Sequence, residues 1–270
     1  MILNLDGTCN TLYKYRAVNQ NAISILENHE LYFSLPKYLN DPYDCQIDIL
    51  ATLNEAFAEF DIINASKIRS KTIIEAMGEI KKDDKIVQRI QELVDNQAIC
   101  SFSLLRDNTL MWAHYADSHR GFCIGFNPQY THEYTKEGFD KIIPQQVIYT
   151  DRNPFSPVLD MIVSTTFSSI PPKKYLSTEA LYKSIALSAV STKSLPWSYE
   201  KEFRYVRVQD GSGCVKISPL AISELIMGCN MTDADRKKLL NLLSKKMWKH
   251  VRLCEVKKST TRFTFEIVDL

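Results

Sequence analysis

Short stretches in which apolar and polar residues alternate recur along the chain, a pattern typical of half-buried β-strands. One stretch, 120–126, is apolar almost throughout, as expected of a central strand. The turn residues 210–213 predict that the segments on either side of them form a hairpin. In all, the pattern predicts strands at residues 12–16, 30–34, 98–103, 120–126, 145–150, 197–208, 214–217, 221–228, 250–256 and 262–268.

Apolar residues spaced three and four positions apart predict helices between these strands. One begins at Asp107, a suitable N-terminal cap. Another begins at Thr232, which forms a capping box with Asp235, and runs to about Lys246. The first helix runs from about residue 19 to residue 28, and its apolar stripe comprises Ala22, Ile23, Ile25 and Leu26.

Residues 52–96 differ from the rest because their charges alternate and nearly cancel. We interpret them as a solvated helical insert of two or three helices that shields the core. Two further helical patterns lie on either side of the prolines at 171–172. The apolar stripe of the insert includes Ile73, Ile74, Met77 and Ile80.

Strands of mixed spacing with clustered helices predict a single α+β domain over 1–270.

Composition narrows the classes of function. A formal charge of +1 gives no global attraction to nucleic acids or membranes, and the sequence contains neither a P-loop nor a Gly-x-Gly-x-x-Gly motif. The first ten residues do not resemble a signal peptide and no apolar run is long enough to span a bilayer, so we expect a cytoplasmic protein without a membrane partner. The seven scattered cysteines are expected to be reduced and free of metal.

The candidate chemistry centres on the segment 197–208. On a strand, side chains two residues apart share a face, so Glu200, Glu202 and Arg204 should point together while aromatic residues point away. Two carboxylates on a supported surface are suited to acid–base chemistry. The alternative is a solvated strand face on which Arg204 neutralises its neighbours.

Two other segments carry candidate polar chemistry. Residues 35–44 contain two prolines together with Asn and Asp, which predicts a functional or tightly structured loop beside the strands. His114 and Tyr115 end a helix that leads into the central strand 120–126. His114 is interpreted either as a helix-terminal or core residue or as a ligand-binding residue.

Several motifs follow one another in a characteristic order: LYKYR (12–16), LYFS (31–34) with NDPYD (40–44), MWAHYA (111–116) with GFCIGF (121–126), and YEKEFR (199–204). With these motifs the chain resembles a large bacterial family of uncharacterised function. More distantly, it resembles the ADP-ribosyltransferase superfamily, whose three signature strands carry an Arg or His, a Ser/Thr or Tyr, and a catalytic Glu. Lys14 directly follows Tyr13, where the superfamily has Arg or His.

This resemblance implies a split or bent mixed β-sheet and the transfer of ADP-ribose from NAD, without metal, to a protein or nucleic-acid acceptor. It also fits a toxin or an anti-phage effector that has an inhibitory partner. Glu202 would stabilise the oxocarbenium-like state, and Glu200 would orient or deprotonate the acceptor. The cofactor-binding residues would be Tyr13, Lys14, Arg16, Tyr32, Ser34, His114 and Tyr115.

Two other functions remain open. Glu255 and Lys257 form a Glu-x-Lys pattern that also occurs in metal-dependent nucleases. Residues 236–258 hold nine Lys or Arg residues against the single acid Glu255, which would suit a non-catalytic module that binds nucleic acid or protein.

Overall fold

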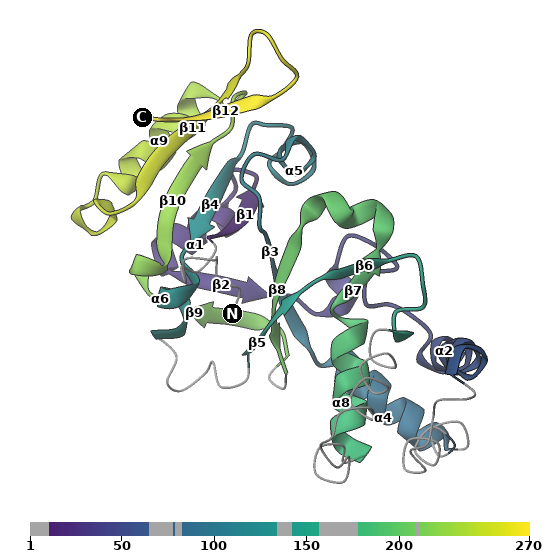
Figure 1. Ribbon diagram of the computed structural model, residues 1–270. Coiled ribbons are helices and arrows are strands. Elements are labelled where there is room, and N and C mark those ends of the chain that lie inside the picture. Colours follow the sequence, from purple (N-terminus) through teal and green to yellow (C-terminus); the bar gives the residue numbers. More distant parts are fainter. Residues whose placement is uncertain (1–10, 65–77, 79–82, 134–141, 157–177, 209–210) are drawn as a thin grey trace, which may run out of the picture.

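The computed structural model describes residues 11–64, 78, 83–133, 142–156, 178–208 and 211–270. Among these residues, the largest sheet has the strand order β12-β11-β10-β4-β1-β3-β8-β5 (Figure 1). Neighbouring strands are antiparallel except β10 and β11, so the sheet is mixed. Its strands are β1 (Leu12–Arg16), β3 (Ala98–Ser103), β4 (Phe122–Phe126), β5 (Ile142–Gln146), β8 (Glu202–Arg207), β10 (Ile222–Met227), β11 (Arg252–Lys258) and β12 (Phe265–Asp269).

The described parts of the chain also form two small sheets of two strands each. In the first, β2 (Glu30–Phe33) pairs with β9 (Gly213–Lys216). The predicted hairpin of β8 and β9 is therefore wrong, because β9 turns away to complete a different sheet. In the second, β6 (Ile148–Thr150) pairs with β7 (Thr192–Ser194). The strand predicted at 145–150 is thus two strands, because β5 pairs with β8 whereas β6 pairs with β7.

The helices flank these sheets (Figure 1). The α-helices are α1 (Gln20–Asn28), α2 (Ile49–Asn64), α4 (Asp84–Asp95), α5 (Thr109–Tyr115), α6 (Pro128–Glu133), α8 (Thr178–Ala189) and α9 (Asp233–Leu243). The short 3-10 helices are η1 (Pro36–Tyr38), η4 (Leu195–Glu200), η5 (Pro219–Ala221) and η6 (Lys246–Trp248).

Most helix predictions are confirmed, with small shifts at the ends. The four residues predicted as the apolar stripe of α1 are all buried. The hydroxyl of Thr232 accepts a hydrogen bond from the backbone N–H of Asp235, so the predicted cap of α9 is present. The cap of α5 is Asn108, not Asp107, because the Asn108 side chain accepts hydrogen bonds from the N–H groups of the first turn.

The predicted insert contributes α2 and α4, and these helices do more than shield the core. Leu53 of α2 and Val94 of α4 are buried against Ile185 of α8 and against Val206 of β8. The helices therefore complete a core on one face of the large sheet. The predicted stripe residues Ile73, Ile74, Met77 and Ile80 and the two prolines at 171–172 lie outside the described residues.

The opposite face of the large sheet packs on α1, α9 and the β2–β9 pair, around Phe102, Phe126 and Tyr205. The predicted α+β class, with a large mixed sheet, is confirmed. No helix in the described ranges has the length and apolar character needed to cross a membrane. Six of the seven cysteines lie in the described part of the chain and are free thiols there.

The large sheet is split between β1 and β3. These strands form a ladder of one residue pair, Tyr13 with Ser103, although β1 contains five residues and β3 six. Beyond this pair, the Lys14 ammonium donates to the backbone carbonyl of Ser101 at 2.8 Å. A side chain thus satisfies an acceptor that an intact ladder would use.

Two glycines allow the chain to pass close to the end of β1. A Cβ on Gly121 would lie 2.1 Å from the carbonyl oxygen of Arg16, and one on Gly228 would lie 2.2 Å from that of His119. The Gly228 N–H donates to the Gly121 carbonyl at 2.9 Å. This close packing fixes the backbone at Arg16, because the atoms a new Cβ would meet belong to the main chain.

We predict that Gly121→Ala lowers the free energy of unfolding by about 3 kcal/mol, because rigid backbone atoms must move. Gly125→Ala should cost less, because its nearest neighbours are side-chain atoms 3.0 to 3.3 Å away. Urea denaturation of both variants tests this comparison. Equal stability of Gly121→Ala and the wild type would contradict it.

Candidate active site

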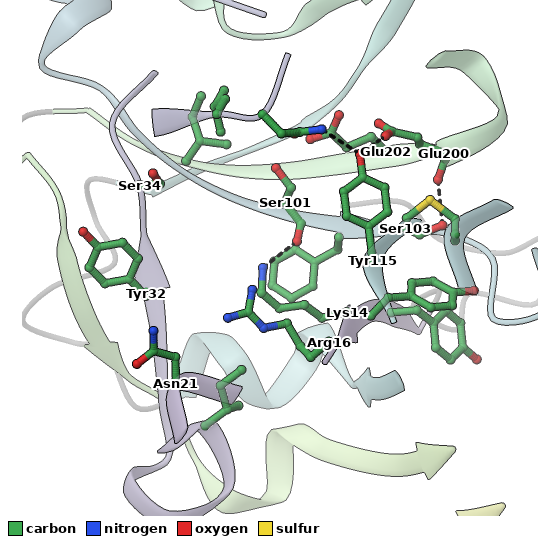
Figure 2. Close-up of a pocket in the computed structure, with 18 of the residues that line it drawn as sticks. Lys14, Arg16, Asn21, Tyr32, Ser34, Ser101, Ser103, Tyr115, Glu200 and Glu202 are labelled. Carbon is green, nitrogen blue, oxygen red and sulfur yellow. Dashed lines mark hydrogen bonds between the residues drawn. The ribbon is translucent and has the colours of Figure 1, made fainter. Parts of the chain in front are cut away.

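A pocket of about 560 Å³ opens at the split between β1 and β3. Four consecutive residues of β1, 13–16, line it together with Ser101, Phe102 and Ser103 of β3. Consecutive strand residues point to opposite faces, so a pocket that meets all of them must run past the separated edges of the strands. Lys14 and Arg16 lie on one side of this pocket and Glu200 and Glu202 on the other (Figure 2).

Three buried carboxylates surround one ammonium group at the acidic end of the pocket. The Lys193 nitrogen lies 2.7 Å from Glu200, 3.2 Å from Glu202 and 3.4 Å from Asp44. Lys193 belongs to β7, and its ammonium also lies 4.9 Å from the centre of the Trp197 ring. One cation therefore holds both candidate catalytic carboxylates and the end of the loop that precedes α2.

The Arg204 side chain is completely buried and binds two of these three carboxylates. Its guanidinium makes paired hydrogen bonds to Glu202, at 2.8 and 3.0 Å, and to Asp44, at 3.0 and 2.5 Å. The remaining N–H donates to the Val190 carbonyl at 2.8 Å. All five donors of the guanidinium are used. The solvated strand face considered from the sequence is therefore wrong.

The two glutamates differ in their ionisation. Burial raises the pKa of Glu200 and outweighs the attraction of Lys193. Burial acts in the same direction on Glu202, but the charge and hydrogen bonds of Arg204 outweigh it and lower the pKa of Glu202 to about 2. Glu202 is thus a fixed anion, whereas Glu200 is suited to exchange a proton. With all three carboxylates ionised, the two cations leave the cluster with one negative charge in excess.

The backbone geometry that brings the glutamates together differs from the one predicted. Glu200 ends η4, and β8 begins at Glu202. Between them, Lys201 has a left-handed conformation with φ of 45°, which is uncommon for a residue other than glycine. The two acids converge through this turn and not through strand alternation, although Glu202 and Arg204 do share a strand face as predicted.

Hydroxyl groups fix the positions of the glutamates. Tyr115 donates to the Glu200 carboxylate at 2.5 Å and accepts from the Asn40 amide at 3.3 Å. Ser103 donates to the Glu200 carbonyl at 2.7 Å, and the Glu202 N–H donates to the Tyr149 hydroxyl at 2.7 Å. Tyr115 thus holds the side chain of Glu200, while Ser103 and Tyr149 hold the backbones of Glu200 and Glu202.

Lys14 and Arg16 form the basic wall of the pocket, and their hydrogen-bonding groups are only partly paired. The Lys14 ammonium donates to β3 and lies 5.1 Å from the centre of the Phe102 ring. In contrast, the buried Nε of Arg16 has no hydrogen-bond partner within the described structure. Arg16 also lines the pocket, and a guanidinium beside a pocket can attract an anionic ligand group through its charge.

The pocket contains most of the residues predicted for the site. The exposed Tyr32 and the half-buried Ser34 also line it. His114 does not line it, and its ring packs 6.1 Å from that of Tyr199. The predicted residues that line the pocket are Tyr13, Lys14, Arg16, Tyr32, Ser34, Tyr115, Glu200 and Glu202.

Sequence reasoning missed Lys193, Tyr149 and the specific role of Asp44. Asp44 ends the loop that was predicted to be functional, so its motif carried a signal. Lys193 and Tyr149 carried none, because neither belongs to a cluster of residues whose spacing indicates a site, although Tyr149 lies in a predicted strand. At the other end of the molecule, the Glu255 carboxylate accepts a hydrogen bond from Arg236 at 2.6 Å and lies 3.1 Å from the Lys257 ammonium.

Residues 111–205 match the model of a family described as a protein of unknown function, DUF2971. This segment begins in α5 and ends in β8, so it includes Tyr115, Lys193 and both glutamates. The expected likeness to an uncharacterised family is found over this part of the chain. No curated protein and no solved structure matches the chain.

The ionisation of Glu202 makes stability depend on pH. Its pKa in the folded protein is about 2, below its ordinary value of 4.5, so folding favours the ionised form. This contribution, about 3 kcal/mol, is complete above pH ~5 and is lost as the pH falls toward 2. In urea denaturation, Glu202→Gln should therefore show a flatter loss of stability over this range than the wild type.

Glu200→Gln is the matched control, because the pKa of Glu200 is raised. It should retain the acid-induced loss that arises from Glu202. Parallel stability curves for the wild type and Glu202→Gln between pH 5 and pH 2 would contradict the assignment of Glu202 as the fixed anion.

Proposed function

We propose that this chain is an ADP-ribosyltransferase that cleaves NAD and transfers ADP-ribose to a macromolecular acceptor. The observation that carries the proposal is the distribution of charge in one pocket. The Arg16 guanidinium stands on one wall, and opposite it stands the carboxylate cluster, which has one excess negative charge when its three acids are ionised. NAD has matching parts, an anionic pyrophosphate and a cationic nicotinamide ring.

In this mechanism, the bond between the ribose C1′ and the nicotinamide nitrogen breaks, and its electron pair leaves with neutral nicotinamide. The ribose becomes oxocarbenium-like, and the fixed anion Glu202 stabilises its positive charge. Arg204 and Asp44 orient Glu202 without touching the ribose. The site is preorganised, because these contacts exist before the substrate binds.

Glu200 completes the transfer. A nucleophilic atom of the acceptor attacks C1′, and its proton passes to the Glu200 carboxylate. A raised pKa suits this role, because a base is most useful when its pKa approaches the working pH. Tyr115 acts as a positioning residue, since its hydroxyl donates to Glu200.

The basic wall would hold the pyrophosphate. Arg16 is better placed than Lys14, because the Lys14 ammonium is already bound to the Ser101 carbonyl. Tyr32, which is 54% exposed, or Tyr13 offers a ring face to the nicotinamide. The pocket volume of about 560 Å³ falls in the usual range for small-molecule sites.

The resemblance to the superfamily requires a hydroxyl residue near the glutamate strand. Ser34, expected in that role, pairs through its backbone with Ile99 and lines the pocket. Ser101 also qualifies, because β3 lies between β1 and β8 and its side chain hydrogen-bonds to Glu202. We therefore propose that Ser101, like Ser34, contacts the substrate.

Two isosteric substitutions separate the proposed roles of the glutamates. Glu202→Gln should lower nicotinamide release at least ~100-fold and leave NAD affinity nearly unchanged, because it removes an interaction that is strongest in the transition state. Glu200→Gln should still release nicotinamide by hydrolysis of NAD but should fail to label an acceptor. Nicotinamide release and incorporation of labelled ADP-ribose are measured in parallel.

Circular dichroism and thermal melts establish that both variants are folded, which matters because both glutamates are buried. Arg16→Gln serves as a binding control and should raise the Kd for NAD about 10-fold or more. Nicotinamide release at the wild-type rate by folded Glu202→Gln would refute the mechanism. Failure of the wild-type protein to bind NAD would refute the proposed substrate.

A further inference from the structure

Exposed lysines cluster on α9 and in and around η6. In Figure 1, α9 lies beside β10 and β11, and these strands are separated from the pocket strands β1 and β3 by β4. Residues 236–258 contain nine Lys or Arg residues and one acid, a formal charge of +8 in a chain whose total is +1, so the rest of the chain carries −7. The lysine surface is defined here by five exposed residues, Lys237, Lys238, Lys245, Lys246 and Lys249.

Stabilisation of the fold does not explain these lysines. The other basic residues of the segment include Arg236 and Lys257, which bind Glu255, and Arg252, which binds Asp269. None of the five lysines has an acidic partner within 4.0 Å in the described parts of the chain. The last turn of α9 contains no basic residue, and Lys237 and Lys238 lie before it, so these two lysines do not complement the negative end of the helix dipole.

The segment that carries the lysines is anchored in the hydrophobic core. Leu239 and Leu243 of α9 are buried on the sheet, and Trp248 of η6 is 2% exposed. The Trp248 ring packs 5.3 Å from that of His29 and 6.3 Å from that of His250. From Lys238 to Leu243, where α9 ends, the helix rises roughly 7.5 Å, a span that reaches more than one phosphate of a nucleic-acid strand, and Lys245 lies beyond that end.

We propose that the lysine surface binds the phosphate backbone of a nucleic acid. Unpaired cations clustered on an otherwise acidic chain attract a polyanion and release its counterions when it binds. A membrane surface fits less well, because the apolar face of α9 is buried on the sheet and is not free to enter a bilayer. Backbone contacts of this kind give affinity without base specificity.

This proposal does not rest on the transferase activity, because binding at α9 requires neither NAD nor the glutamates. Fluorescence anisotropy with a labelled 20-nucleotide single strand, and with the corresponding duplex, measures it directly. Five phosphate contacts predict a slope of log K against log salt of about −4, so affinity should fall roughly 300-fold between 50 and 200 mM salt.

Two double variants with the same change in net charge provide the comparison. Lys237→Gln with Lys238→Gln should make the slope about 2 smaller in magnitude and weaken binding at low salt. Lys85→Gln with Lys183→Gln removes two exposed helical lysines elsewhere and should leave both values unchanged. Replacing all five lysines of the surface by Gln should abolish binding.

Three results would overturn the proposal. They are the absence of binding at 50 mM salt, equal losses in the two double variants, and binding to phosphatidylserine vesicles in preference to both nucleic acids. Because the lysines are exposed, the variants are expected to keep the wild-type melting temperature, which a thermal melt confirms.

Discussion

The site depends on the ion pair between Arg204 and its two carboxylate partners, buried beneath the pocket. Charges taken out of water are tolerated only when they are paired and their hydrogen bonds are satisfied. Arg204 meets this condition through Asp44, Glu202 and the Val190 carbonyl. The loop before α2, the end of α8 and β8 are therefore held together by one guanidinium, and Lys193 extends the same network to Glu200.

The split between β1 and β3 determines which side chains meet. In an intact sheet, Lys14 and Arg16 would face away from Glu202, because the alternation of β1 places them on the opposite side. Where β1 and β3 separate, no backbone lies between the two faces of the sheet, so side chains from both faces can line one pocket. The Lys14 ammonium replaces the missing backbone donor at Ser101, so the Ser101 carbonyl keeps a hydrogen-bond partner although the strands have separated.

Local sequence patterns were sufficient for most elements and for part of the site. The stripe of α1, the cap of α9 and the strand β1 follow from spacing and capping within a few residues. The pairing of β9 with β2 could not be predicted, because the pairing of distant strands depends on packing that no local pattern encodes. Likewise, the convergence of Glu200 and Glu202 was expected from strand periodicity but arises from a left-handed turn at Lys201. Lys193 became recognisable only once the fold brought it beside the acids.

The contacts that build the pocket join parts of the chain far apart in sequence. Arg204 and Asp44 are separated by 160 positions, and Lys14 and Ser101 by 87. Closing such long loops is entropically unfavourable until much of the chain is already ordered, so contacts of this kind tend to form late in folding. The segment 111–205 holds Glu200 and Glu202 but neither Asp44 nor Arg16, which makes the pocket a property of the assembled chain. A product that lacks the first 44 residues would thus carry the two glutamates without the cavity in which they act, whereas a nascent chain would hold Arg16 and Asp44 well before the glutamates are added, and the site would come into being only as folding is completed.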